Sequence, residues 1–363
     1  MALLEKMLYF CTLKGKLFLI ILNDFIIIDN IIMFEEIKKK YLSTLKSTET
    51  EDWLDLRIVR PLCYFLAVFF AKLGIHPNAV TIASMIIGAG TCFLFAHGSY
   101  YYEGWNGLWL NVIAVVLLIV ADLLDCTDGQ LARLTGKKSR LGRILDGMAG
   151  FTWFVPIYIA LMFRFYHFHS LEFGWFGIPD TEQNVLIATA VVVVLGLISG
   201  FAGMGGQQRL ADYYIQIHLF MLNGDKGSEL DSAEQQQKAY DETPDEGNRL
   251  WKQFLKNYIS YTRKQEKATP EFQKLMATLR EKYGSAGDMP EEIREELLRE
   301  SRRIMPWNAM LTFNFRSGMF FLFCLIDLPV WNFLFEIICL GLLTSCINRH
   351  HEACCKSLSQ TLP

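Results

Sequence analysis

Three aspartates stand in a short polar stretch between two long apolar segments, where acidic side chains are costly. The stretch runs from Leu124 to Gly150 and reads LDCTDGQLARLTGKKSRLGRILDGMAG. Asp125 and Asp128 are one helical turn apart and share one side of a helix, and Asp146 follows in the next apolar helix. Converging carboxylates repel one another unless a cation lies between them, and hard divalent cations prefer oxygen ligands. The stretch therefore predicts a divalent-metal site that binds phosphate oxygens.

Small residues accompany these carboxylates and leave the backbone accessible. Gly129 and Ala132 lie on the helix face of Asp125, and Gly142 lies on the face of Asp146. A flat or phosphorylated group can then approach the backbone. The alternative is a set of solvated acids that pair with the basic residues of the connecting loop, which are Lys137, Lys138, Arg140 and Arg143. Acids inside apolar helices are functional more often than not, which favours the metal site.

Long apolar segments must position these groups, and they indicate a membrane protein. Of the 363 residues 52% are hydrophobic, and the net charge of −3 gives no sign of a nucleic-acid partner. A bilayer core about 30 Å thick needs roughly 20 apolar residues per helix. The sequence predicts an all-α integral membrane protein with six transmembrane helices, at residues 78–98, 107–130, 141–166, 184–206, 310–326 and 330–347.

The charges of the loops predict the orientation. Residues 97–107 and 167–183 contain no Lys or Arg, whereas residues 133–143 are strongly basic. The positive-inside rule places the basic loop in the cytosol. We therefore expect a cytoplasmic (inner) membrane protein with both termini inside and the polar stretch facing the cytosol.

The other segments complete the domain organisation. Residues 1–32 form an N-terminal extension with Asp24 and Asp29 in an apolar run, and Met33 is the expected native start. A juxtamembrane segment follows at 33–77. It ends in an interfacial helix, for which an additional spanning helix is the alternative. Membrane helices 1–4 occupy residues 78–222, and a cytosolic helical insertion follows at 223–308. Membrane helices 5–6 occupy residues 309–349, and a cytosolic tail occupies 350–363.

Local signals refine three of these segments. Asn78 is expected to cap the first membrane helix. In the insertion, residues 225–249 are polar and predict a loop, whereas the apolar spacing further on predicts helices at 250–265, 270–284 and 289–305. The tail NRHHEACC, residues 348–355, is expected to be solvated, with metal binding as the alternative.

The polar stretch resembles the signature of the CDP-alcohol phosphotransferases, which is D-x-x-D-G-x-x-A-R, about eight residues, then G-x-x-x-D-x-x-x-D. Seven of its eight fixed positions match: Asp125, Asp128, Gly129, Ala132, Arg133, Gly142 and Asp146. The HPNAVT entry to the first membrane helix and the six-helix layout are also similar to the family. The insertion lies outside the resemblance.

The resemblance implies a site and a reaction. Asp125, Asp128 and Asp146 would hold Mg²⁺ or Mn²⁺, and the motif residues Gly129, Ala132 and Arg133 would face the cytidine diphosphate. An alcohol hydroxyl attacks the β-phosphorus of a CDP-linked lipid and CMP leaves. The expected donor is CDP-diacylglycerol. The acceptor would be a small polar alcohol such as inositol phosphate or glycerol phosphate, with serine and inositol also open. A second copy of the chain is a further expected partner.

The chain departs from the family at Gly150, where the signature has its fourth aspartate, the candidate general base. Asp122, one turn before Asp125, is the candidate substitute, and Asp146 is the other candidate catalytic carboxylate. The rival interpretation is a catalytically inactive relative that binds nucleotide-lipid or partner proteins. Two arginines, Arg209 and Arg316, are candidates for binding the acceptor. For Arg316 the alternative is an ion pair with a carboxylate inside the bundle.

Overall fold

The computed structural model describes residues 40–45, 47, 49–51, 53–137, 139–224, 230 and 232–361, without the side chains of Met204 and Thr361. The chain divides into two units, Met1–Lys46 and Ser47–Pro363. The expected extension at 1–32 and the expected start at Met33 lie outside the described residues. The second unit carries every helix named in the following paragraphs.

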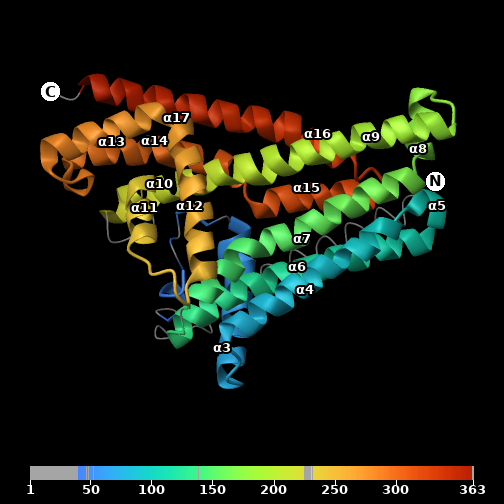
Figure 1. The fold of residues 1–363 in the computed structure, drawn as a ribbon, viewed down its shortest axis with the longest axis horizontal. Helices are drawn as coiled ribbons and strands as arrows, with labels where there is room; N and C mark the ends of the chain where they lie inside the picture. Colours follow the sequence, from blue (N-terminus) through green and yellow to red (C-terminus); the bar gives the residue numbers. More distant parts are fainter. Residues whose placement is uncertain are drawn as a thin grey trace, which may run out of the picture. The chain divides into compact units, whose positions relative to one another are not determined.

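Within the described residues the second unit consists of helices and connections, with no strand (Figure 1). Its apolar part contains α3 (Arg60–Lys72), α4 (Pro77–His97), α5 (Tyr100–Glu103), α6 (Trp105–Thr135), α7 (Arg140–His167), α8 (Ser170–Phe176), α9 (Glu182–Ile198), α15 (Phe313–Leu325), α16 (Trp331–Phe335) and α17 (Gly341–Thr361). Its polar part contains α10 (Gln208–Asn223), α11 (Ala233–Asp241), α12 (Arg249–Ala268), α13 (Pro270–Tyr283), η4 (Ala286–Asp288) and α14 (Glu291–Ala309). Three π-helical segments lie next to these helices. They are η1 (Asp55–Val59) before α3, η2 (Ser199–Gln207) between α9 and α10, and η5 (Glu336–Leu340) between α16 and α17.

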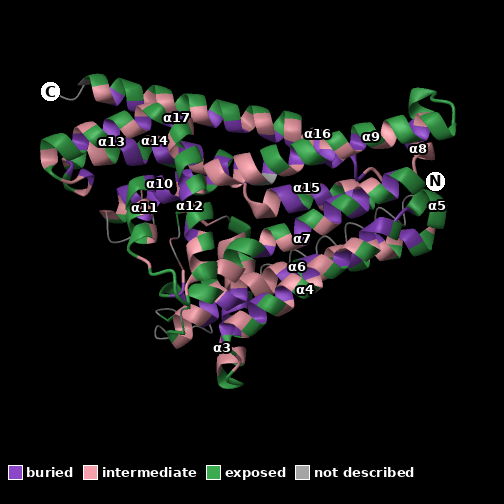
Figure 2. Ribbon diagram, viewed as in Figure 1, coloured by how far each residue is buried: buried purple, intermediate pink, exposed green. Residues whose placement is uncertain are grey.

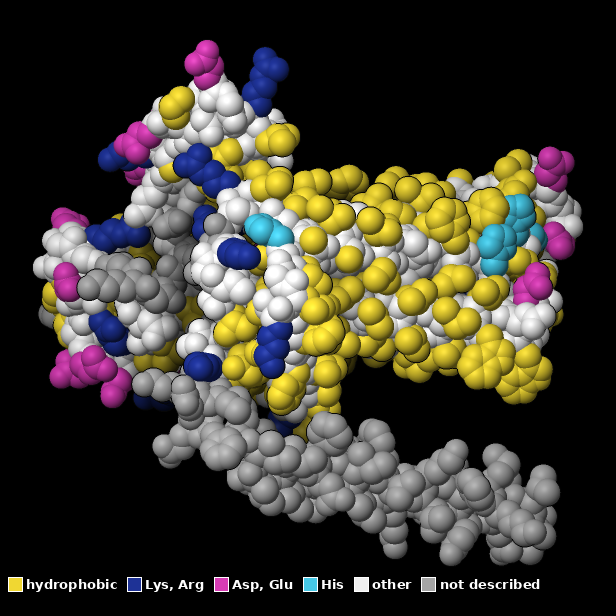
Figure 3. Space-filling model, turned by 90° about the horizontal axis from the view of Figure 1, so that it is seen from below, with side chains coloured by type: hydrophobic (Ala, Val, Ile, Leu, Met, Phe, Trp, Pro, Cys, Tyr) yellow, Lys and Arg dark blue, Asp and Glu magenta, His cyan; other side chains and the backbone are white. Residues whose placement is uncertain are grey.

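Five helical segments are long and apolar enough to cross a membrane: Pro77–His97, Trp105–Thr135, Arg140–His167, Glu182–Asn223 and Trp331–Gln360. Figure 3 shows hydrophobic side chains over most of one face, with Lys and Arg gathered at one end of it. The predicted all-α class is confirmed. Helix α15 has 13 residues, or about 20 Å at 1.5 Å per residue, which is shorter than the bilayer core. The count of six spans therefore stays a prediction.

The motif helices form one closely packed group. Helix α4 packs along both α6 and α7, and their shared core includes the buried residues Phe95, Leu118, Trp153 and Ile157. Gly88 allows this contact, because a Cβ atom there would lie 2.3 Å from the Trp153 ring. The packing fixes the end of α6 beside the start of α7.

The start of α4 is fixed to the start of α7 by polar contacts. The N-cap of α4 is His76, whose Nδ1 accepts from the Asn78 N–H at 3.2 Å. Asn78 was the predicted cap, and that prediction is wrong because its side chain is used elsewhere. Its Oδ1 accepts from the Ser139 hydroxyl at 3.3 Å, and Ser139 in turn caps α7 at Gly142.

Two polar segments are more ordered than their composition predicted. Helix α11 lies inside the stretch predicted as a loop, because Ser232 and Gln235 form a capping box at its start. The tail predicted to be solvated continues α17 to Thr361. Its buried residues, Ile347, His351, Cys355 and Leu358, recur at helical spacing and face α13 and α14 (Figure 2). Helices α12, α13 and α14 lie where apolar spacing predicted them.

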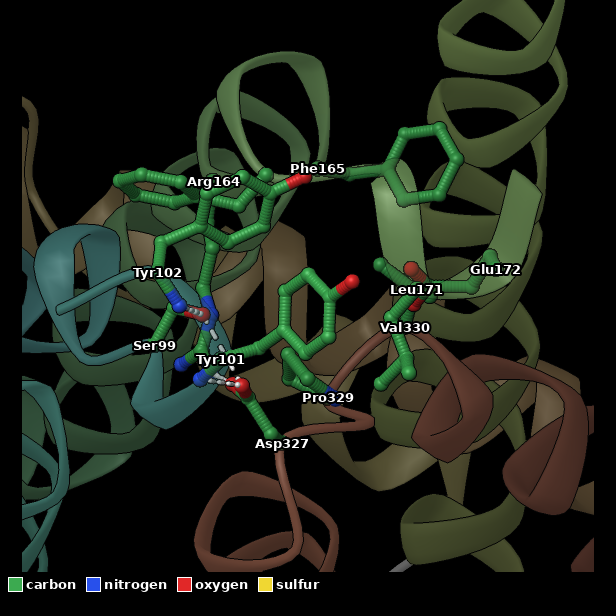
Figure 4. A pocket seen from close by; sticks show the side chains of 11 residues that line it. Ser99, Tyr101, Tyr102, Arg164, Phe165, Leu171, Glu172, Asp327, Pro329 and Val330 are labelled. Carbon is green, nitrogen blue, oxygen red and sulfur yellow. Dashed lines mark hydrogen bonds and ion pairs between the residues drawn. The ribbon is translucent and has the colours of Figure 1, made fainter. Parts of the chain in front are cut away.

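A buried ion pair joins the helices at the other end of the bundle (Figure 4). Arg164 of α7 is 2% exposed and pairs with Asp327, which follows α15. Asp327 also accepts from the Ser99 hydroxyl at 2.9 Å and the Tyr101 N–H at 2.7 Å. Arg164 also donates to Asn111 of α6 at 3.1 Å. These contacts connect four helical segments at one point.

Glu172 of α8 lines the small pocket beside this ion pair, and its ionisation predicts a pH dependence. Burial raises the pKa of Glu172 to about 7, so the folded state favours the protonated acid. Its contribution to stability is present below the ordinary Glu pKa and is lost as the pH rises through about 7. We expect the thermal midpoint in detergent to fall between about pH 5 and pH 8. Glu172→Gln should flatten that slope, whereas the exposed Glu182→Gln should keep it; an unchanged slope in Glu172→Gln would contradict the assignment.

Candidate functional site

The predicted carboxylates gather where α6 ends and α7 begins. Asp122, Asp125 and Asp128 lie on α6, and Asp146 lies in the second turn of α7. Asp125 is within electrostatic range of the other three, and Asp128 is within range of Asp146. The close packing of α4, α6 and α7 thus places residues from two helices in one cluster.

The carboxylates of this cluster fit a divalent cation. Oδ1 of Asp125 is buried and has no hydrogen-bond partner among the described residues, which is costly for a carboxylate oxygen unless a cation binds it. Asp128 is 5% exposed and accepts a hydrogen bond from the Thr81 hydroxyl of α4. Asp146 is exposed. The ligand oxygens of the three residues are not all within 4.8 Å of one another. Their side chains would therefore have to rotate to bind one shared ion.

The predicted nucleotide-binding residues lie beside this cluster. A Cβ atom on Gly129 would lie 3.5 Å from the Arg133 guanidinium, so Arg133 folds over the glycine. Ala132 is half-buried on the same helix. The charge of Asp146 reaches Arg133. A guanidinium next to carboxylates and a small-residue face is suited to bind phosphate oxygens between them.

Arg60 was not predicted as a site residue, and the fold brings it to the carboxylate cluster. Arg60 lies at the start of α3 and donates to Cys126 Sγ at 3.2 Å and to Glu51 at 3.0 Å. Its charge reaches Asp122 and Asp125. The only sign of this role in the sequence was an arginine at the start of the predicted interfacial helix. Its position in the sequence does not specify which other helix the side chain contacts. Thr81, which binds Asp128, was missed for the same reason.

Asp122, the candidate substitute base, lies between Arg60 and the rest of the cluster. The charges of Asp55 and Arg60 act on it from the side of η1 and α3, and Asp125 is within its range on α6. Asp122 is half-buried. Its exposure is thus in the same range as that of Asp125.

The two candidate acceptor-binding arginines differ in their surroundings. Arg316 is 2% exposed, lies 3.1 Å from Glu336 and donates to Gln207 at 2.7 Å. Arg316 therefore forms an ion pair inside the bundle, which was the alternative to acceptor binding. Arg209, in the first turn of α10, donates to the Gly205 carbonyl, and its buried Nε has no hydrogen-bond partner among the described residues. The buried Nε of Arg316 also lacks a hydrogen-bond partner among the described residues, so the two arginines differ in that Arg316 forms an ion pair with a carboxylate.

Helix α12 of the insertion lies against the start of α7. Arg140 donates to Asn248 at 3.3 Å and stands over the Trp251 ring at 5.3 Å. The Phe254 ring is in contact range of Gly147, which follows Asp146, since a Cβ on that glycine would lie 3.6 Å away. The half-buried aromatic face of α12 therefore borders the carboxylate cluster.

The part of the chain that holds this cluster is similar to a known family. Residues 74–206 match the family model of the CDP-alcohol phosphatidyltransferases. This range contains α4, α6, α7, α9 and the complete carboxylate motif. Residues 74–206 are thus similar to the CDP-alcohol phosphatidyltransferases, a family whose enzymes transfer phospholipid head groups and generally use divalent metal ions.

Individual relatives match between 21% and 29% of the chain. It is 38% identical over 76 residues to the archaetidylinositol phosphate synthase of Pyrococcus horikoshii, covering 21% of this chain and 35% of the relative. It is 34% identical over 82 residues to the enzyme of the same name from Aeropyrum pernix, covering 22% and 36%. It is 26% identical over 105 residues to a class-I family protein of Dictyostelium discoideum, covering 29% and 26%. The chain thus spans about a third of the length of the curated relatives it matches.

Proposed function

We propose that this protein is a membrane transferase of phospholipid synthesis, with its site facing the cytosol and six spanning helices. It moves a phosphatidyl group from a CDP-linked donor, CDP-diacylglycerol, to a small polar alcohol such as inositol phosphate or glycerol phosphate. The observation that carries the proposal is the orphaned Oδ1 of Asp125, which lies beside Asp128 and Asp146 inside the matched domain. A homodimer stays a prediction.

The residues of the cluster divide the work of the reaction. Bound Mg²⁺ or Mn²⁺ on Asp125, Asp128 and Asp146 would neutralise charge on the phosphate oxygens. Arg133, assisted by Arg60, would bind the diphosphate and hold it in line.

The acceptor side uses two further residues. The acceptor hydroxyl oxygen bonds to the β-phosphorus, the bond from that phosphorus to the bridging oxygen breaks, and CMP leaves. Asp122 would take the hydroxyl proton, because Gly150 has no side chain that could do so. Arg209 would bind a phosphate on the acceptor, because no carboxylate among the described residues neutralises its guanidinium. Arg316 has a weaker claim to this role, because Glu336 already neutralises it.

A second function is favoured by one specific observation, the glycine at position 150. A catalytically inactive relative would retain the phosphate-binding residues and bind nucleotide-lipid or a partner protein without turnover. The experiment that separates the two is release of CMP from CDP-diacylglycerol by the purified protein. It should be screened over inositol phosphate, glycerol phosphate, serine and inositol. Acceptor-dependent release supports the transferase; CDP binding without release supports the inactive relative.

Replacing Gly150 with Asp tests the missing base. Gly150→Asp places a fourth carboxylate one turn after Asp146. If no other group serves as base, CMP release should rise by about 10²-fold, the low end for general-base catalysis. If Asp122 serves, Gly150→Asp should change little and Asp122→Asn should lower release by at least about 10²-fold. Rates of the three proteins at one pH distinguish these cases. Unchanged release in Asp122→Asn would reject Asp122 as the base.

A further inference from the structure

Three residues of α17 bring metal-ligand atoms together outside the carboxylate cluster. His351, Glu352 and Cys355 each offer one atom, and these atoms all lie within 4.8 Å of one another. Nδ1 of His351 is 3.5 Å from Oε1 of Glu352, and Sγ of Cys355 is 3.9 Å from the same nitrogen. Among the described residues they form the one group of three His, Cys, Asp or Glu side chains at such spacing.

These separations are close to those around a tetrahedral zinc ion. Zinc bonds of about 2.0–2.1 Å to nitrogen, 2.0–2.2 Å to oxygen and 2.3 Å to sulfur, at tetrahedral angles, place the ligand atoms about 3.3–3.6 Å apart. The His351–Glu352 separation already falls in this range. The Cys355 sulfur would need to move by a few tenths of an ångström, which a side-chain adjustment provides.

The surroundings hold the three side chains in place. Cys355 is fully buried and His351 is 8% exposed. The His351 ring lies between the rings of Tyr214 and Phe272, at 5.0 and 5.4 Å between centroids. Within the part of the chain that the structure describes, its imidazole makes polar contacts to Glu352 and Cys355. Enclosure of this kind orients a metal-binding imidazole and keeps water from displacing the ion.

Glu352 connects the cluster to the neighbouring helix. Its Oε2 accepts from the Glu271 N–H at 2.7 Å and its Oε1 from the Phe272 N–H at 3.3 Å, both at the start of α13. Backbone donors of this type orient a carboxylate ligand and leave a lone pair for the metal. All three ligand side chains belong to α17, within the candidate membrane span Trp331–Gln360, and the hydrogen bonds of Glu352 connect them to the first turn of α13.

We propose that His351, Glu352 and Cys355 form a zinc site on α17, in which Glu352 is oriented by backbone donors of α13. A thiolate and an imidazole select Zn²⁺ over Mg²⁺ and Mn²⁺, which prefer oxygen ligands alone. The site is therefore chemically distinct from the carboxylate cluster, and it does not depend on the proposed transferase activity. Binding displaces the thiol proton, so zinc affinity falls as the pH is lowered.

The adjacent residues His350 and Cys354 supply matched controls. Full-length protein in detergent, stripped with a chelator, is titrated with ZnCl₂ against a chromophoric competitor. Wild type, His350→Gln and Cys354→Ser should each bind one zinc per chain. His351→Gln and Cys355→Ser should bind at least about 100-fold more weakly, because even outer-shell losses cost 10–100-fold. Equal loss in the control variants, or no stoichiometric zinc in wild type, would overturn the site.

A second measurement uses only the wild-type protein, so that misfolding of a variant cannot decide the outcome. Zinc should slow alkylation of Cys355 and leave alkylation of the half-buried Cys354 unchanged, as resolved by peptide mass spectrometry. It should also raise the thermal midpoint, by an amount that grows with the logarithm of the zinc concentration above Kd, as expected for a ligand of the folded state. Equal protection of both cysteines, or of neither, would contradict the proposal.

Discussion

Asp128→Asn is expected to abolish metal-dependent binding of CDP and to lower CMP release by at least about 10²-fold. A catalytic metal ion contributes several kcal/mol of charge stabilisation, and each factor of ten in rate corresponds to about 1.4 kcal/mol. Asn preserves the size of the side chain and an oxygen that can accept from Thr81. It removes the negative charge that a hard cation requires.

Calorimetry with CDP and either Mg²⁺ or Mn²⁺ measures the binding part of this prediction. The matched control is Asp241→Asn, an exposed acid at the end of α11, which should bind CDP like wild type. Wild-type affinity in Asp128→Asn would reject the cluster as the metal site. Lost binding in both variants would point to a general defect in folding.

Glu336→Ala is expected to destabilise the folded protein by about 3–5 kcal/mol, the range for removing one partner of a buried ion pair. Glu336 is 1% exposed and 3.1 Å from Arg316. It also accepts from the Tyr158 hydroxyl at 2.6 Å and from the Ser199 hydroxyl. The substitution would leave a buried guanidinium without a counter-charge and two hydroxyls without an acceptor.

Thermal unfolding in one detergent measures this loss. The matched control replaces both partners, Arg316→Met with Glu336→Leu, because a buried pair exchanged for apolar residues of similar size is often neutral. A thermal midpoint in Glu336→Ala equal to wild type would contradict a structural role for the pair. The double variant also tests the acceptor role of Arg316. If its KM for the acceptor is unchanged while the protein stays folded, the arginine serves the fold alone.

The sequence by itself determined the class of the protein and the place of its motif. Apolar runs of about 20 residues are long enough to cross a membrane whatever their neighbours are. The spacing of Asp125 and Asp128 places them on one helix face through local geometry alone. Both features depend on residues close together in the chain, so they could be predicted without a tertiary structure.

Only the tertiary structure decided which distant side chains meet. Arg60 reaches Cys126, Thr81 reaches Asp128, and Arg316 pairs with Glu336 because separate helices pack together. The apolar periodicity of a helix identifies a buried face but not the helix that covers it. For the same reason the tail around His351 looked solvated: its polar residues carry no sign that α13 provides backbone donors for Glu352. Burial changes the role of a polar side chain, and burial is a property of the packed helices rather than of any one segment.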